Sequence, residues 1–196
     1  MKTLFQACLT AAMALICATG CYRGGARPVE LSALTHNQDW VTLPRVPVLI
    51  QDGEHECGAA ATAMVLNYWG EPTTADQVRA SSKISTEHGI TAGYLRTYIR
   101  ARGLQAYLIE GTFDDIEREL KAGRPVMVGV QRKFTTGLYD HYQVVVGIDR
   151  TAQQLAVIDP AEGYREYSFS DFISEWAAAK ALTLVVSRPA VAPEGK

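Results

Sequence analysis

Apolar residues recur at helical spacing in the first half of the chain. The spacing i, i+3, i+4, i+7 predicts a helix over residues 57–69, and Gly70 supplies its stop. Two later stripes predict helices that end at Gly103 and at Gly123. The apolar positions that carry these helices are Ala61, Met64, Val65 and Tyr68, then Leu95, Tyr98 and Ile99, and finally Phe113, Ile116 and Leu120.

Short runs rich in valine and isoleucine follow in the second half of the chain, and such runs are typical of buried strands. Their positions predict strands over residues 126–130, 143–148, 155–158 and 182–186. One more helix separates the last two strands, and its apolar face consists of Phe169, Phe172, Ile173 and Trp176. Because helices come first and strands come later, the pattern favours an α+β fold over a doubly wound parallel sheet.

A short apolar run near the N-terminus, residues 7–18, follows the positively charged Lys2. The run is too short to cross a bilayer core of about 30 Å as a helix, but it suits the core of a signal peptide. It ends in Ala18-Thr19-Gly20-Cys21, which resembles the lipobox of bacterial lipoproteins. The resemblance implies a signal peptide over residues 1–20. It also implies that fatty acids such as palmitate are attached at Cys21, the first residue of the mature chain.

A lipid on Cys21 would anchor the protein in the bacterial cell envelope. Because Tyr22 rather than an aspartate follows the cysteine, the resemblance to sorted lipoproteins favours the outer membrane, facing the periplasm. The alternative is a soluble secreted protein that is cut after an Ala-x-Ala-like site. Residues 21–44 are polar and glycine-containing, which predicts a flexible tether. We expect a single domain over residues 45–188 and a disordered tail over residues 189–196.

Composition and charge exclude several classes of protein. Of the 196 residues, 47% are hydrophobic and 20% are charged, which is typical of a folded domain and argues against disorder. The formal net charge is -2 and the sequence has no basic stripe, so we do not expect a nucleic-acid partner. The sequence has no second long apolar segment, which excludes a polytopic membrane protein.

The use of cysteine points to one residue. Export processing would remove Cys8 and Cys17, and lipid attachment would use Cys21, so that Cys57 is left as a free thiol. Exported proteins usually pair their cysteines, and a buried, inert core cysteine is the simpler explanation of a lone one. However, Cys57 begins the predicted helix, where the positive end of the helix dipole favours the thiolate. With Gly58 next to it, the sulfur is open to a substrate, so we predict a reactive thiol.

A base and an orienting acid can be proposed from the strand pattern. His141 stands at the start of one predicted strand, and Asp159 stands at the end of the next. If the two strands form an antiparallel hairpin, Asp159 comes to lie beside His141. A surface histidine and a turn-forming aspartate before proline are the simpler explanations of each residue alone. The remaining histidines are less suitable as bases: His36 lies in the expected tether, His88 in a polar loop, and His55 too close in sequence to Cys57.

Several segments together resemble one family of peptidases. The similar segments, in order, are residues 46–51, 57–60, 64–70, 120–126, 141–146 and 158–160. They resemble the bacteriocin-processing, double-glycine leader peptidases and their relatives, which are papain-like cysteine peptidases. The resemblance extends over about residues 44–188. It implies a papain-like α+β fold, in which N-terminal helices pack on an antiparallel sheet.

The resemblance also implies a role for each candidate residue. Cys57 would be the nucleophile, and His141 would be the general base that takes its proton and later protonates the leaving amine. Asp159 would orient the imidazole. Gln51 would donate a side-chain N–H bond to the oxyanion hole, with the backbone N–H of Cys57 as the second donor. No cofactor and no metal are implied.

The function implied is that of a membrane-anchored cysteine peptidase that cleaves an exported protein or peptide, with a secretion system as a possible partner. The oligomeric state is open. A papain-like cell-wall (peptidoglycan) endopeptidase with the same triad is one alternative, and a non-catalytic peptide-binding relative is another. A zinc site built from His55, Cys57, His141 and Asp159 is a third, although the spacing of these residues resembles no standard zinc motif.

Overall fold

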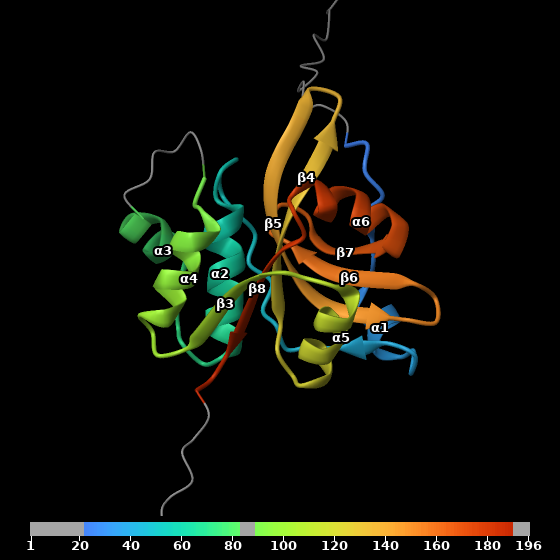
Figure 1. Ribbon diagram of the computed structural model, residues 1–196, viewed down its shortest axis with the longest axis horizontal. Coiled ribbons are helices and arrows are strands. Elements are labelled where there is room, and N and C mark those ends of the chain that lie inside the picture. Colours follow the sequence, from blue (N-terminus) through green and yellow to red (C-terminus); the bar gives the residue numbers. More distant parts are fainter. Residues whose placement is uncertain (1–21, 83–88, 190–196) are drawn as a thin grey trace, which may run out of the picture.

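The computed structural model describes residues 22–82 and 89–189 (Figure 1). The expected signal peptide, Cys21, His88 and residues 190–196 of the expected tail lie outside the described residues. The fold is α+β, as the sequence predicted, and its eight-stranded sheet is antiparallel at every pairing. No helix within the described ranges is long and apolar enough to cross a membrane.

The helices and strands alternate only in part along the chain. The helices are α1 (Leu31–Thr35), α2 (Cys57–Tyr68), α3 (Ala75–Ser82), α4 (Ala92–Arg100), α5 (Phe113–Lys121) and α6 (Phe169–Ala178). The strands are β1 (Arg27–Pro28), β2 (Val41–Thr42), β3 (Gln105–Glu110), β4 (Val126–Phe134), β5 (Gly137–Asp149), β6 (Gln154–Asp159), β7 (Gly163–Ser168) and β8 (Leu182–Ser187). The strand order is β1-β7-β6-β5-β4-β8-β3, and β2 pairs with β5 off this path.

Helices cover both faces of the central strands. In Figure 1, α2, α3 and α4 group on one side of β4 and β5, and α5 and α6 lie on the other. The core is divided in the same way, because neighbouring side chains of a strand point to opposite faces. Val144 belongs to the cluster under α2 and α4, whereas Val145 belongs to the cluster under α5 and α6. Residues 143–149 of β5 are therefore buried on both faces, which explains the continuous apolar run in this part of the strand.

The helix α2 is buried along most of its length. Its residues from Cys57 to Leu66 are all buried, so it has no polar stripe of the kind that a surface helix shows. Small side chains allow this close packing: a Cβ atom added to Gly58 would lie 3.1 Å from the ring of Tyr142 in β5. The first turn of α2 is thus held directly against the strand that carries His141.

The predicted helices and strands are all present, but several elements were not predicted. Strands β4 and β5 extend well beyond the apolar runs that predicted them and form a long hairpin that projects from the body of the molecule in Figure 1. The strands β3 and β7 and the helix α3 were not predicted from the sequence. Their sequences mix charged and apolar residues without a clear period, because each has a partly exposed face.

The prediction of a flexible tether differs from the structure. Residues 22–44 include β1, α1 and β2, and they pair with the sheet at both ends, through β7 and through β5. The Gly24-Gly25 pair is packed rather than free, since a Cβ at Gly24 would lie 1.8 Å from Oε1 of Glu175 and one at Gly25 would lie 2.2 Å from Cγ of Asp171. The segment docks because unpaired strand edges and the surface of α6 offer it partners, which local sequence does not reveal.

Candidate active site

Cys57 is the first residue of α2, as the apolar spacing predicted. The loop before it is tied to the end of β6 by a hydrogen bond from the backbone N–H of Gln51 to the carbonyl of Pro160, 2.8 Å long. Pro160 directly follows Asp159, so this bond fixes the loop before Cys57 beside the end of β6. The side chain sits at the N-terminal end of a helix whose first N–H groups have no partner within the helix, a position that stabilises a negative sulfur.

His141 and Asp159 meet across two paired strands. In the antiparallel pairing of β5 with β6, Val144 lies opposite Ile158, which sets Asp159 near the part of β5 that holds His141. The Nε2 atom of His141 lies 2.9 Å from Oδ1 of Asp159. The hairpin argument from the sequence therefore placed this pair correctly. The thiol of Cys57 is coupled to the same imidazole, because each of the two groups shifts the pKa of the other.

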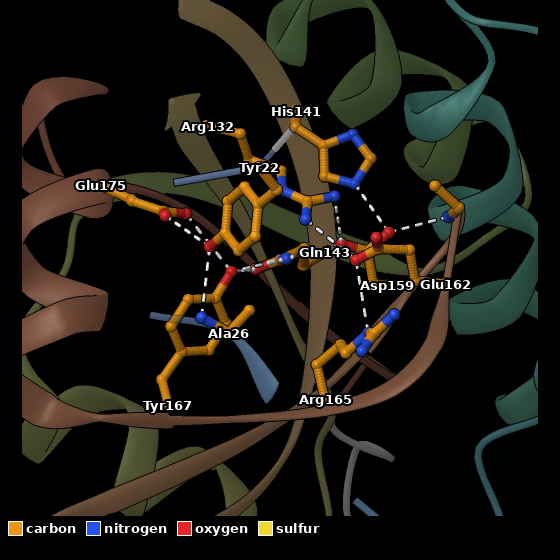
Figure 2. A network of polar contacts seen from close by, with 11 residues as sticks. Tyr22, Ala26, Arg132, His141, Gln143, Asp159, Glu162, Arg165, Tyr167 and Glu175 are labelled. Carbon is orange, nitrogen blue, oxygen red and sulfur yellow. Dashed lines mark hydrogen bonds and ion pairs between the residues drawn. The ribbon is translucent and has the colours of Figure 1, made fainter. Parts of the chain in front are cut away.

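The carboxylate of Asp159 is fully buried and accepts four hydrogen bonds, several of which are drawn in Figure 2. Its Oδ1 accepts from the ring of His141 and from the backbone N–H of Ala161, 2.7 Å away. Its Oδ2 accepts from Nε2 of Gln143 at 2.9 Å and from the guanidinium of Arg132 at 3.1 Å. Each oxygen accepts two hydrogen bonds, so the carboxylate has little freedom to rotate.

The charges in the site favour a thiolate and an imidazolium. Burial by itself would raise the pKa of the Cys57 thiol, but the hydrogen bond and charge of His141 and the backbone N–H groups of Tyr142 and Gly58 lower it below its ordinary value. Burial would likewise lower the pKa of His141, but its bonds to Asp159 and Cys57 raise it to about 9. These opposite shifts favour transfer of the thiol proton of Cys57 to the imidazole of His141.

Asp159 stays ionised in spite of its burial. Burial alone would raise the pKa of this carboxyl, but the hydrogen bond and charge of His141, followed by the charge of Arg132, hold it well below its usual range. A buried carboxylate is tolerated only when it is paired and hydrogen-bonded, and four donors meet that condition here. The negative charge is therefore fixed beside the imidazole at neutral pH.

Gln51 lies in the loop that leads to α2, as the proposed oxyanion role requires. Its side-chain N–H donates a bond of 2.7 Å to the carbonyl of Gly53, and its Oε1 is buried without a hydrogen-bond partner. An exchange of the amide oxygen and nitrogen would set two oxygens against each other, so the bond to Gly53 fixes the orientation of the amide. One N–H of Gln51 remains available to a substrate.

Two polar residues of the site were not predicted. Gln143 stands two positions after His141, so strand alternation puts both on one face of β5, and this signal was present in the sequence. Arg132 lies in the part of β4 beyond the predicted strand, and only the long hairpin brings it to Asp159. In the part of the chain that the structure describes, no three residues among His, Cys, Asp and Glu are grouped to hold a metal ion.

A cysteine that begins a buried helix and is coupled to an imidazole, on this α+β fold, is the arrangement found in papain-like cysteine peptidases, and the chain is a cysteine peptidase of this class. Comparison with known families makes the assignment more specific. The sequence model described as the Peptidase_C39 like family matches residues 43–184, and the chain belongs to this family.

Individual relatives agree with the assignment. The chain is 25% identical over 129 residues to the Lactococcin-G-processing and transport ATP-binding protein LagD of Lactococcus lactis subsp. lactis. That match covers 66% of this chain but 17% of the relative. The resemblance to bacteriocin-processing peptidases is thus confirmed, and it concerns only the matched 17% of LagD.

Solved structures of related peptidases share the fold. The peptidase domain of Streptococcus ComA, a bifunctional ABC transporter involved in a quorum-sensing pathway, matches with a TM-score of 0.61 at 23% identity. The match covers 74% of this chain and 100% of that one. A double glycine motif protease from an AMS/PCAT transporter, solved with its leader peptide, matches with a TM-score of 0.57 at 25% identity. This second match covers 74% of this chain and 93% of the other.

Proposed function

We propose that the protein is a membrane-anchored cysteine peptidase that hydrolyses peptide bonds of an exported protein or peptide through Cys57, His141 and Asp159. The observation that carries the proposal is the position of His141, whose Nε2 lies 2.9 Å from Oδ1 of Asp159 and whose imidazole lowers the pKa of the Cys57 thiol. A nucleophile, a base and an orienting group in this order form the general arrangement for acyl transfer. The relative that was solved with its leader peptide supports a peptide as the substrate.

In the first half of the reaction, the thiolate of Cys57 attacks the carbonyl carbon of the scissile peptide bond. The carbonyl oxygen becomes an oxyanion, which the backbone N–H of Cys57 and the free N–H of Gln51 stabilise. The imidazolium of His141 then gives its proton to the amide nitrogen. The C–N bond breaks, the amine product leaves, and a thioester on Cys57 remains.

In the second half, a water molecule attacks the thioester while neutral His141 takes one of its protons. The C–S bond breaks, the acid product leaves, and the sulfur departs as the thiolate that His141, now protonated, stabilises again. Asp159 keeps its negative charge throughout and holds the ring through Nε2, so that the other ring nitrogen serves the sulfur.

A peptide library tests the proposal directly. The purified protein and its Cys57→Ala variant are incubated with peptides derived from the exported proteome, and the products are identified by mass spectrometry. Cleavage that depends on Cys57, His141 and Asp159 supports the proposal. A binding signal without any cleavage would favour a non-catalytic relative, and cleavage confined to purified peptidoglycan peptides would favour the cell-wall endopeptidase. Peptides with and without a Gly-Gly pair before the cut show whether double-glycine specificity is retained.

The membrane anchor is a separate part of the proposal. It rests on the lipobox-like sequence that ends in Cys21, and in a bacterium with two membranes the following Tyr22 favours the outer membrane, facing the periplasm. Metabolic labelling with a fatty-acid analogue is expected to mark the wild type and the Cys57→Ala variant equally. The Cys21→Ala variant is expected to stay unlabelled and to leave the membrane fraction. Equal labelling of the Cys21→Ala variant would remove the anchor from the proposal without affecting the peptidase activity.

A further inference from the structure

Residues 22–28, which we call the N-terminal clasp, lie across the tip of the β4–β5 hairpin and the helix α6. Tyr22 forms a β-bridge with Phe134, and the backbone N–H of Arg23 donates a bond of 2.7 Å to the carbonyl of Lys133. Further along, the clasp continues as β1, which pairs with β7. The clasp is thus fixed at both ends by backbone bonds.

The ring of Tyr22 covers the side chain of Arg132. The guanidinium carbon lies 4.1 Å from the ring centroid, and Arg132 is only 3% exposed. From this buried position the guanidinium donates to Oδ2 of Asp159 at 3.1 Å and to Oε2 of Glu162 at 2.9 Å. An aromatic face attracts a cation and excludes water from it. Without the ring, this face of the guanidinium would be open to water, which would weaken its bond to Asp159.

The hydroxyl of Tyr22 begins a second connection to the same carboxylate oxygen, which can be followed in Figure 2. It donates a bond of 2.5 Å to Oε1 of Glu175, and Oε2 of Glu175 accepts a bond of 3.3 Å from the hydroxyl of Tyr167. Tyr167 accepts a bond of 2.9 Å from Nε2 of Gln143, the other side-chain donor to Oδ2 of Asp159. Tyr22 therefore stacks on Arg132 and is linked through Glu175 and Tyr167 to Gln143. These are the two side chains that donate hydrogen bonds to Oδ2 of Asp159.

The sequence of the clasp is suited to this docking. Gly24 passes so close to α6 that an added Cβ would lie 1.8 Å from Oε1 of Glu175 and 2.1 Å from the hydroxyl oxygen of Tyr22. Burial and the bond to Glu175 raise the pKa of Tyr22 to about 12, so its hydroxyl remains a donor at every physiological pH. A glycine at position 24 thus leaves the space that the Tyr22 hydroxyl and the Glu175 carboxylate occupy.

We propose that Tyr22 is a positioning residue for catalysis, which acts through Arg132 and Gln143 to keep Asp159 in the orientation that His141 needs. The inference rests on the proposed role of Asp159 in the triad. The clasp starts one residue after Cys21, so the segment next to the expected anchor is itself a part of the active centre. Small displacements of a catalytic group can reduce turnover by up to about 10²-fold, which makes such support effective.

Substitutions of Tyr22 in the full chain test the inference. For Tyr22→Ala we expect kcat to fall by about tenfold while KM stays nearly constant, because the proposed role of Tyr22 is to orient Asp159 and not to bind the substrate. Tyr22→Phe keeps the aromatic face over Arg132 but loses the hydroxyl link to Gln143, so it is expected to show a smaller loss of activity than Tyr22→Ala. If Tyr22→Ala does not fold, Tyr22→Leu fills the same space without an aromatic face, and the same loss in kcat is expected. Rates are compared per folded molecule, as judged by near-ultraviolet circular dichroism.

Tyr107→Ala is the matched control. Tyr107 also lies under an arginine, since the guanidinium carbon of Arg100 is 5.5 Å from its ring centroid. It belongs to β3, at the opposite edge of the sheet from the clasp. Loss of this pair is expected to leave kcat unchanged. An equal fall of kcat in the Tyr107→Ala and Tyr22→Ala variants would mean a general loss of stability and would overturn the inference.

A proton signal gives a readout that stability alone does not move. The Nε2 proton of His141, shared with a buried carboxylate, should give a downfield proton resonance that exchanges slowly. We expect it to broaden or vanish in Tyr22→Ala and Arg132→Ala but to persist in Tyr22→Phe and Tyr107→Ala. An unchanged signal and unchanged kcat in Tyr22→Ala would overturn the inference. Asp159→Ala separates the two proposals: full activity there removes Asp159 from the triad, whereas a loss there with an active Tyr22→Ala removes the clasp alone.

Discussion

The Nε2 atom of His141 lies 2.9 Å from Oδ1 of Asp159, and this contact is set by the pairing of two core strands. Because one ring nitrogen is occupied by the carboxylate, the other is left for the thiol of Cys57. The base is thus oriented by two paired, buried strands, while the nucleophile comes from the start of a helix packed against one of them.

Cys57 is expected to react with iodoacetamide faster than free cysteine does. At pH 6, where free cysteine is almost wholly protonated, we expect a rate at least about tenfold higher, since the lowered pKa gives Cys57 a larger fraction of thiolate than free cysteine has. The alkylation rate is followed by mass spectrometry, with peptide mapping to assign the label. The His141→Ala variant should lose this advantage. A thiol in the wild type that reacts no faster than free cysteine would indicate an inert core cysteine.

The pH dependence of kcat/KM is expected to be bell-shaped. Activity rises with pH as Cys57 loses its proton, and it falls as His141 loses the proton that the leaving amine requires, with a limb near pH 9. Asp159→Asn removes the negative charge that stabilises the imidazolium, so the pKa of His141 falls and the alkaline limb moves to lower pH.

The control for this shift is Asp140→Asn. Asp140 is exposed and adjacent to His141 in sequence, and it hydrogen-bonds to Gln131 rather than to the imidazole. Water and salt screen an exposed charge, so its loss should leave the alkaline limb almost in place. Equal shifts in the two variants would contradict a specific contact between Asp159 and His141.

Gln51→Ala is expected to lower kcat by about 10²–10³, which is the usual cost of one lost oxyanion donor. KM should change little, because the bond forms only when the oxyanion does. Gln105→Ala, in the edge strand β3, is the matched glutamine control and is expected to behave as the wild type. A Gln51→Ala variant with wild-type kcat would leave the backbone N–H of Cys57 as the remaining proposed donor.

Gly24→Ala is expected to lower the free energy of unfolding by about 1–3 kcal/mol, since the new methyl group has no space between Glu175 and Tyr22. Thermal and urea unfolding measure the effect. The matched control is Gly93→Ala in α4, where an added Cβ meets nothing within 4 Å, and there we expect a gain of about 0.5–1 kcal/mol. Equal stability of Gly24→Ala and the wild type would show that the clasp is not packed as described.

Part of the site could be predicted because its signals are local. The apolar spacing marked the helix that Cys57 begins, and two valine-rich runs joined by a short connection brought Asp159 to His141 by antiparallel pairing. Gln51 depended on the family resemblance, and the structure adds the bond that ties its loop to the carbonyl of Pro160. Short-range periodicity and hairpin geometry were sufficient for Cys57, His141 and Asp159.

What the sequence by itself determined is therefore the α+β class, the main helices and strands, and the three residues of the proposed triad. Tertiary structure alone decided the place of residues 22–44, the long hairpin that carries Arg132 to Asp159, and the stacking of Tyr22 on that arginine. The physical reason is sequence separation. A polar segment such as the clasp has no period of its own, and it becomes ordered only because distant strand edges and α6 supply hydrogen-bond partners and a close-fitting surface.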